Sequence, residues 1–515
     1  MKKLPIGIWD FEEIRTGNYV YVDKTEFVYI LVTEGKYYFL SRPRRFGKTL
    51  LVDTLRRLFE GRKELFEGLY IYDKWDWEKR FPVVKIDFSK GDVQSVEALR
   101  EVIIENIRDV KKKYDVDFPD SDQMGLLLKR LVVSLFEKYN SQVVILIDEY
   151  DKPILDNITE KELARKLRRI LADFYGVIKG LDEYVRFVFL TGVSKFSKVN
   201  LFSKLNNLND ITIDKRYSTI CGYTERELDI YFSEFLAGID MDEVRQWYNG
   251  YSWLGESVYN PYDILLFIDK GFTFKNYWFE TGTPTFLIEL LKEKRYHIPS
   301  LENVEVTENI LGSFDVDYIK VEALMWQTGY LTIKGAKRVG IRTYYILGYP
   351  NYEVKMSLND VILDYLGDIE ENTKSRLGEE CYNSLASGDV EKFIEVIKRL
   401  LASLPYTSYT KNEIAKYEGY YINIIYSFLA SLGLEIVAED VTNRGRIDLA
   451  IKVEGKIYVL ELKMSGIGED PLSQIKEKRY YEKYLGEGEV YVVGLVIDED
   501  ERNVRESKWE RVKEN

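Results

Sequence analysis

Residues 143–147 restrict the fold more than any other part of the sequence. All five are valine, isoleucine or leucine, and two carboxylates, Asp148 and Glu149, follow them directly. An unbroken run of this kind is typical of a strand that is buried on both faces, as strands in parallel sheets are. The chain must therefore supply helices that cover both faces of such a sheet.

Strands and helices alternate around this segment. Apolar runs predict strands at residues 36–41, 83–88 and 185–190. Helical periodicity predicts helices at residues 50–59, 96–113, 125–139 and 160–175. Strands that alternate with helices predict an α/β fold with a parallel sheet.

A basic loop with the sequence Ser-Arg-Pro-Arg-Arg-Phe-Gly-Lys-Thr joins the first strand to the first helix. This is the position of a P-loop, in which backbone N–H groups and a helix N-terminus bind phosphates. Lys48 is expected to meet the β- and γ-phosphate oxygens, and Thr49 to bind Mg²⁺. The full pattern has a glycine five residues before Gly47, where this chain has Arg42. The alternative is a basic loop that only caps a helix.

The strand at 143–147 delivers its two carboxylates to the carboxyl edge of the sheet, where ligands bind. Asp148 is expected to hold the Mg²⁺ shell, and Glu149 to orient or deprotonate the attacking water. Thr191 ends the next buried strand, so its hydroxyl could sense the γ-phosphate; the alternative is a polar strand terminus. The predicted nucleotide-binding residues are Arg45, Phe46, Gly47, Lys48, Thr49, Leu50, Asp148 and Thr191. The positive side chains that surround the phosphates of a bound nucleotide form a charge clamp. Arginines that could complete it are Arg42, Arg44, Arg45, Arg168 and Arg169.

Composition limits the function classes. The chain has 515 residues, 73 basic and 86 acidic, and a net charge of −13, which argues against a general polyanion binder but not against a local basic groove. Its two cysteines, Cys221 and Cys381, lie too far apart in sequence for a metal-binding motif and fit a reducing compartment. No secretory signal and no apolar run of membrane-spanning length is present, so we expect a cytoplasmic protein without a membrane partner.

These segments resemble the AAA-ATPase-like family, which is widespread in bacteria and archaea. The resemblance over residues 1–210 is carried by Pro-Ile-Gly-Ile-Trp-Asp-Phe from Pro5, Tyr-Val-Asp-Lys-Thr from Tyr21, the loop at 41–49, and three further segments that begin at Leu146, Leu190 and Leu201. Arg42 is typical of that family. The resemblance implies ATP and Mg²⁺ as cofactors. It extends over nearly the whole chain, and such proteins often end in a PD-(D/E)XK nuclease-like domain.

The C-terminal region supports that second domain independently. A hairpin is predicted at residues 447–463, with acids at Asp448 and Glu461 and a lysine at Lys463. A two-residue turn at 454–455 would place Asp448 opposite Glu461, and a metal ion would relieve the repulsion between these like charges. Oxygen ligands suit Mg²⁺ or Mn²⁺, and Lys463 could orient or activate water. The alternatives are a surface hairpin with a cross-strand ion cluster and a retained fold without activity.

The resemblance implies further roles. Glu418, on the preceding helix, and Gln474, on the following one, would support the metal and the water. Lys478 and Tyr480 could contact the phosphate backbone. The predicted metal ligands are Thr49, Asp148, Glu418, Asp448 and Glu461, and the predicted catalytic residues are Glu149, Asp448, Glu461, Lys463 and Gln474.

We therefore expect four parts: an AAA-like P-loop ATPase domain at 1–220, a helical lid region at 221–300, a winged-helix-like region at 301–370 and a PD-(D/E)XK nuclease-like domain at 371–515. The leading interpretation is an ATPase that controls a metal-dependent nuclease acting on DNA or RNA, with a homo-oligomer compatible with the sequence. The second is a nucleotide-dependent switch whose C-terminal domain binds nucleic acid or a partner without cutting. A structural interaction protein would require all the motifs to be coincidental.

Overall fold

The computed structural model describes residues 2–195, 205, 207–281, 285–312, 315, 317–404, 418–442, 445–466 and 470–512. The chain forms two compact units. The first comprises Met1–Leu287 and Glu305–Asn351, and the second comprises Ile288–Val304 and Tyr352–Asn515. No helix in the described ranges is long and apolar enough to cross a membrane. Most of the resemblance segment that begins at Leu201 lies outside the described residues.

A parallel sheet forms the core of the first unit. Its strands are β1 (Tyr37–Ser41), β2 (Val83–Asp87), β3 (Val143–Asp148), β4 (Val185–Gly192) and β5 (Asn209–Asp210). They lie in the order β2-β3-β4-β1-β5, and every neighbouring pair is parallel. All six residues of β3 are buried. The predicted parallel α/β sheet is confirmed.

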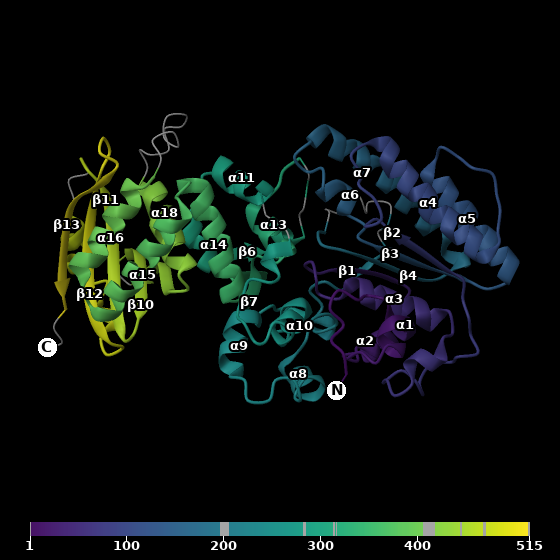
Figure 1. Ribbon diagram of the computed structural model, residues 1–515. Coiled ribbons are helices and arrows are strands. Elements are labelled where there is room, and N and C mark those ends of the chain that lie inside the picture. Colours follow the sequence, from purple (N-terminus) through teal and green to yellow (C-terminus); the bar gives the residue numbers. More distant parts are fainter. Residues whose placement is uncertain are drawn as a thin grey trace. The chain divides into compact units, whose positions relative to one another are not determined.

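Helices cover both faces of this sheet (Figure 1). On one side lie α1 (Phe11–Thr16), α2 (Thr25–Glu34) and α3 (Lys48–Phe59). On the other side lie α4 (Val96–Tyr114), α5 (Met124–Tyr139), α6 (Lys152–Leu155) and α7 (Lys161–Gly176). The double cover explains why the central strands lack the polar alternation of a half-exposed sheet.

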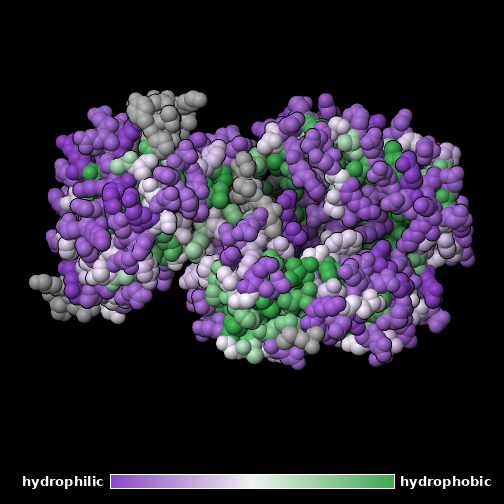
Figure 2. All heavy atoms as spheres, in the orientation of Figure 1, coloured by the Kyte–Doolittle hydropathy of each residue, from purple (hydrophilic) through white to green (hydrophobic). Residues whose placement is uncertain are grey.

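A small helical cluster follows the sheet. It contains α8 (Glu225–Tyr231), α9 (Met241–Tyr248) and α10 (Pro261–Asp269). Helical periodicity in the sequence predicts a helix over residues 224–236, but α8 ends at Tyr231. Apolar side chains gather on the surface where α8–α10 lie (Figure 2), and partly buried residues such as Trp247, Phe272 and Phe274 pack against the core of this cluster.

A helix and a three-stranded sheet complete the first unit. The sequence predicts a helix at residues 321–329 and a hairpin with strands at 330–334 and 343–347. The helix is α13 (Val321–Thr328), and the hairpin is β7 (Thr332–Val339) with β8 (Arg342–Gly348). The strand β6 (Val304–Thr307) extends this sheet in the order β6-β8-β7, and α12 (Glu308–Leu311) follows β6. The hairpin is longer than the sequence predicted. Its likeness to a winged helix stays a prediction, as does the division into four domains.

The second unit contains a mixed sheet. Its strands are β9 (Glu435–Thr442), β10 (Gly445–Val453), β11 (Lys456–Met464), β12 (Glu489–Asp498) and β13 (Asn503–Arg511), in the order β13-β12-β11-β10-β9. Only β11 and β12 pair in parallel, across a connection that contains α19 (Pro471–Lys478). Other helices of the unit are α14 (Tyr352–Gly367), α15 (Glu371–Ser387), α16 (Val390–Ala402) and α18 (Glu418–Ser431); α11 (Thr285–Glu293) spans the boundary between the units.

One alternative for this unit is excluded and one expectation is corrected. The alternative of a surface hairpin is excluded, because β10 and β11 lie inside the sheet and Leu449, Ile451 and Leu460 are buried. The sequence predicts a helix over residues 471–485, but α19 ends at Lys478, since Arg479 adopts a left-handed conformation with φ of 49°. A left-handed residue terminates an α-helix even where it is not glycine.

Candidate functional site

The phosphate loop connects β1 to α3. The backbone of Gly47 is left-handed, with φ of 90°, and its carbonyl accepts the first helical hydrogen bond from Leu51 N at 3.0 Å. Residues 44–51 all line one cavity of about 490 Å³, which includes six of the predicted nucleotide-binding residues. The Lys48 side chain is buried, and its Nζ donates to the Pro43 carbonyl at 2.9 Å. A cavity of this volume is typical of a small-molecule site.

Carboxylates meet at the ends of two neighbouring strands. Asp87 ends β2 and pairs in register with Asp148 at the end of β3. The Thr49 hydroxyl hydrogen-bonds to Asp148. Burial, and then the charges of Glu149 and Asp87, raise the pKa of Asp148 to about 6. A carboxylate in this environment is held at an energetic cost that a cation would relieve.

Glu149 occupies an unusual position. Its backbone is left-handed, with φ of 51°, and its side chain lines the cavity with Lys48 and Thr49. Strained residues of this kind cluster at functional sites, because the surrounding structure has to hold them. Asp148 and Thr191 do not line the cavity. Thr191 is fully buried, and its Oγ1 has no hydrogen-bond partner among the described residues, so its role as a phosphate sensor stays a prediction.

Arg42, in the position of the missing glycine, is fully buried. Its guanidinium donates to the carbonyls of Ser41 and Thr212 at 2.9 Å and of Tyr217 at 3.0 Å, and lies 4.1 Å from the ring centroid of Trp253. These contacts use the side chain for structure. Arg42 is therefore not available for the charge clamp that the sequence left open.

The other arginine candidates differ in position. Arg44 and Arg45 are exposed and line the cavity, and Arg45 lies 4.7 Å from the ring centroid of Tyr262. Arg168 lies 3.5 Å from Asp315 and from Asp317, and neither it nor Arg169 lines the cavity.

Sequence reasoning missed several residues around this site. Asp87 could have been found, because it ends a buried strand as Asp148 does. Lys152 and Lys24 also line the cavity, paired with Asp156 and Glu227 respectively. Lys24 Nζ also donates to the Thr219 carbonyl at 2.8 Å. The motif that begins at Tyr21 therefore connects the N-terminal arm, the residues that precede β1, to the chain just before α8. The sequence alone gives no signal for these two lysines.

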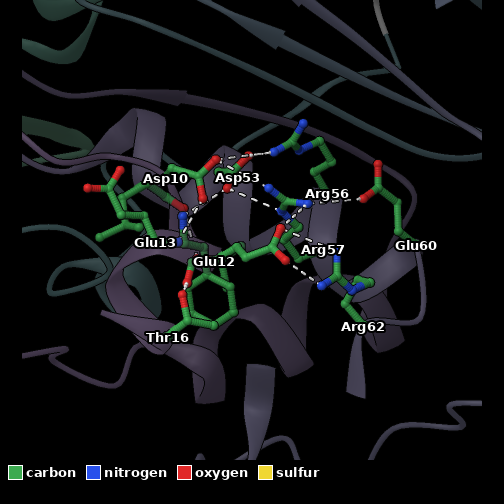
Figure 3. A network of polar contacts seen from close by, with 12 residues as sticks. Asp10, Glu12, Glu13, Thr16, Asp53, Arg56, Arg57, Glu60 and Arg62 are labelled. Carbon is green, nitrogen blue, oxygen red and sulfur yellow. Dashed lines mark hydrogen bonds and ion pairs between the residues drawn. The ribbon is translucent and has the colours of Figure 1, made fainter. Parts of the chain in front are cut away.

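The N-terminal arm is fixed to the phosphate-loop helix by a charged network (Figure 3). Asp53 on α3 is fully buried, accepts a hydrogen bond from Phe11 N at 2.9 Å and lies 2.6 Å from Arg56. Asp10 caps α1 and pairs with Arg57 at 3.2 Å. The network places residues 5–9 beside α3, and of these Pro5, Gly7, Ile8 and Trp9 line the nucleotide cavity.

The C-terminal hairpin pairs β10 with β11 in the register that would bring Asp448 and Glu461 together. Glu454 and Gly455 both have positive φ, as a type I′ turn demands, and Val453 pairs with Lys456. The ladder continues to Leu449 and Leu460, so Asp448 and Glu461 occupy the next opposed positions. The predicted two-residue turn and pairing register are confirmed.

The predicted C-terminal residues converge on the α19 face of the sheet. Lys463 Nζ lies 3.2 Å from Glu461 Oε1 and 3.7 Å from Glu418 Oε1. Asp448 Oδ2 accepts a hydrogen bond from Leu462 N at 2.8 Å, and Gln474 Nε2 donates to Glu461 Oε1 at 2.6 Å. Burial, and then the charge of Asp448, raise the pKa of Glu461 well above its ordinary value.

Two buried atoms in this cluster lack partners among the described residues. They are Glu461 Oε2 and Gln474 Oε1, both acceptors. Two acceptors without donors are what a cation or a bound water would satisfy. Among the described residues no group of three acidic, histidine or cysteine side chains could hold a metal, so backbone, water or substrate oxygens would complete the coordination.

Lys478 and Tyr480 differ in their access to a ligand. The side chain of Lys478 is exposed. Tyr480 is buried in the core between α19 and the sheet, so the expected contact of Tyr480 with a phosphate backbone is wrong.

Comparisons with known proteins match both halves of the chain. The family described as predicted AAA-ATPase matches residues 5–202, and the PD-(D/E)XK nuclease superfamily matches residues 416–507. An uncharacterized protein in the vnfD 5′ region of Azotobacter chroococcum mcd 1 is 46% identical over 511 residues, which covers 98% of each chain. Among solved structures, Cdc6p from Pyrobaculum aerophilum matches 66% of this chain and 89% of its own, with 13% identity and a TM-score of 0.22.

Proposed function

This chain belongs to the predicted AAA-ATPase family and carries a C-terminal domain of the PD-(D/E)XK nuclease superfamily, and from that premise we propose that it hydrolyses ATP in the N-terminal cavity and cleaves nucleic acid at the C-terminal cluster. The observation that carries the ATPase half is the cavity that Lys48, Thr49 and Glu149 line together. The observation that carries the nuclease half is the cluster of Asp448, Glu461 and Lys463 in one pairing register.

The residues of the cavity fit a magnesium nucleotide. The N-terminus of α3 and the backbone of residues 44–49 would bind the phosphates, with Lys48 as their charge partner. Thr49 and Asp148, which already contact each other, would hold Mg²⁺, and the bound ion would neutralise charge on the β- and γ-phosphate oxygens. Glu149 would orient or deprotonate the attacking water.

The basic side chains that line the cavity indicate which residues would neutralise the phosphate charge that Lys48 and Mg²⁺ leave uncompensated. Arg44, Arg45, Lys48 and Lys152 all line it, whereas Arg42 is committed to structural contacts. We expect Lys152, three residues after Glu149, to exchange its partner Asp156 for the terminal phosphate. This assignment gives the charge clamp to a lysine of the same chain.

The C-terminal cluster fits a divalent cation, because two buried acceptor atoms have no donor among the described residues. Asp448 and Glu461 would hold it, and Glu418 and Gln474 would support the metal and its water. A bound Mg²⁺ or Mn²⁺ would polarise the scissile phosphate. Lys463 would hold or activate the attacking water, since its ammonium already lies beside Glu461.

Two variants test the ATPase half. Lys48→Ala should abolish tight ATP binding in calorimetry, because the phosphate loop loses its charge partner. Glu149→Gln should still bind ATP but hydrolyse it far more slowly, since the Mg²⁺ ligand Asp148 remains. Unchanged affinity in the first variant would remove the P-loop assignment, and wild-type turnover in the second would place the base elsewhere.

A cleavage screen tests the nuclease half. The full chain is incubated with Mg²⁺ or Mn²⁺, with and without ATP, and with labelled single- and double-stranded DNA and RNA. Cleavage by wild type that disappears in Glu461→Gln supports the proposal, and Lys48→Ala in the same assay shows whether ATP controls it. If wild type binds Mn²⁺ but cuts none of these substrates, the enzyme reading of this domain is wrong.

A further inference from the structure

The hairpin β7–β8 ends in an exposed apolar tip. Val339 pairs with Arg342 across the two-residue turn Gly340–Ile341, and Gly340 has φ of 61°, as the first position of a type II′ turn requires. Ile341 is 93% exposed and Val339 57% exposed. Ile341 is the most exposed large hydrophobic side chain in the described part of the chain. Val339 and Ile341 lie two residues apart on this turn and form a small exposed apolar patch, a feature that marks an interaction site when charged residues surround it.

The tip is also positively charged. Residues 336–343 contain Lys337, Arg338 and Arg342 and no acidic residue, although the whole chain has a net charge of −13. Lys337 pairs with Glu305. Arg338 and Arg342 form no ion pair within the described ranges, and Arg338 Nε donates to the Gly340 carbonyl at 3.1 Å, which places it beside the turn. Two guanidinium groups therefore flank the apolar tip.

The helix before this hairpin, α13, has almost no exposed surface with which to bind a ligand. Val321 and residues 323–327 of α13 are buried, and Gln327 bridges the backbone of Lys195 and Leu311 at 3.0 and 2.8 Å. A helix packed in this way has no free face that could enter the groove of a DNA or RNA duplex, which is how the helix of a DNA-binding domain commonly reads a sequence. The outer half of the hairpin is exposed on both faces, so it is the part of this region that a large ligand can reach.

We propose that the β7–β8 tip binds duplex nucleic acid, with Arg338 and Arg342 on the phosphates and Ile341 inserted in a groove against the bases. The charge of the tip favours a polyanion, because each phosphate contact releases bound counterions. An apolar side chain between two arginines suits a groove with phosphates on both rims, where such wedges unstack and bend the duplex. This binding surface is separate from the C-terminal cluster and does not depend on cleavage there.

The test measures the binding of a fluorescent DNA duplex to the full chain by anisotropy in EDTA, across a salt series. Arg338→Ala/Arg342→Ala should lower affinity on the order of tenfold at about 0.1 M salt and reduce the salt slope by about 2. Ile341→Ser should reduce affinity without changing that slope, and should reduce duplex bending measured by energy transfer. Arg108→Ala/Lys112→Ala, an equal charge change at exposed positions of α4, is the matched control and should bind as wild type.

Three outcomes would overturn the proposal. The first is a wild-type chain that does not bind the duplex. The second is affinity in both tip variants that equals the α4 control, with all melting temperatures unchanged. The third is binding of wild type, but not Ile341→Ser, to vesicles of anionic lipid, with duplex binding unaffected; that would assign the tip to a membrane surface. Because EDTA removes divalent cations, this assay measures binding apart from metal-dependent cleavage, so a chain that binds the duplex in EDTA but cuts nothing in the Mn²⁺ screen would keep this surface and lose the proposed nuclease.

Discussion

Arg42 shows how one residue can replace a motif glycine without loss of the motif's geometry. A P-loop glycine leaves room for the backbone to turn, whereas Arg42 turns inward and binds three carbonyl groups and the face of Trp253. Its neighbour Phe46 packs edge-on against Tyr251 and Trp253. The start of the phosphate loop is thus held by Thr212 and Tyr217, which lie 170 and 175 positions from Arg42, and by the still more distant Tyr251 and Trp253.

Restoring the glycine is expected to harm the protein. Arg42→Gly removes a charged donor from three buried carbonyl groups and leaves space beside Trp253, which should cost on the order of 3 kcal/mol. Chemical denaturation measures this loss. Arg44→Gly, in the same loop but exposed, is the control and should cost less than about 1 kcal/mol. Equal stability of the two variants would show that the buried contacts of Arg42 contribute nothing.

The raised pKa of Asp148 predicts a pH dependence. Burial raises this pKa from 3.8 to about 6, so the contribution of Asp148 to the stability of the metal-free protein is present below pH 3.8 and is lost as the pH rises through 6. Mg²⁺ needs the carboxylate, so its enhancement of ATP affinity should grow as the pH rises from 5 to about 7.

Calorimetry with and without Mg²⁺ over this pH range measures that enhancement. Asp148→Asn should lose it, and any pH dependence that comes from the nucleotide itself will remain in the variant. The same pH profile in wild type and Asp148→Asn would contradict the assignment of Asp148 as a magnesium ligand.

At the scale of elements, the C-terminal site depends on one hairpin. The type I′ turn at Glu454–Gly455 sets which residues oppose each other across β10 and β11. A slip of one residue would turn Asp448 and Glu461 to opposite faces of the sheet. The turn therefore controls whether the acids can share a ligand, although it lies six residues from either of them.

Removing either acid should separate metal binding from folding. Asp448→Asn and Glu461→Gln should each lose the rise in melting temperature that Mn²⁺ gives wild type. In metal-free buffer each should be as stable as wild type or more stable, by up to about 1 kcal/mol, because the like-charge contact is relieved. Insertion of one glycine after Gly455 is the register control and should lose the Mn²⁺ effect with every acid still present. Equal stabilisation of all four proteins by Mn²⁺ would place the metal elsewhere.

The sequence predicted elements well where burial leaves a pattern. Four of the five strands of the first sheet were found to within two residues, because strands that are covered on both faces are uniformly apolar. The two-residue edge strand β5 was not predicted, since so short a segment leaves no apolar run. The strand β13 was missed, since it lies at the edge of its sheet and most of Asn503–Arg511 is charged or polar. The early end of α19 was missed because Arg479 takes the left-handed conformation that usually signals glycine. The side-chain partners of Arg42 and Lys24 depend on packing between distant segments, which no local pattern records.

At the scale of the whole molecule, charge is distributed unevenly. The chain is acidic overall, yet the cavity gathers Arg44, Arg45, Lys48 and Lys152, and the β7–β8 tip gathers three cations. Both of the proposed ligands, a nucleotide and a nucleic acid, are polyanions. An acidic surface with local basic sites limits unspecific binding elsewhere on the protein.

The path of the chain between the two units has a consequence for biosynthesis. The first unit is interrupted by Ile288–Val304, which belongs to the second unit and buries Ile298 and Leu301 there. A ribosome therefore makes these apolar residues early, but the rest of their unit, from Tyr352 onward, follows later. Once Val304 has been made, 515 − 304 = 211 residues remain, and at roughly 5–20 residues per second they take about 11–42 s to emerge. During that interval the apolar side chains of Ile288–Val304 lack the partners that bury them in the folded unit. We expect chaperones to cover this segment until the rest of the unit is made.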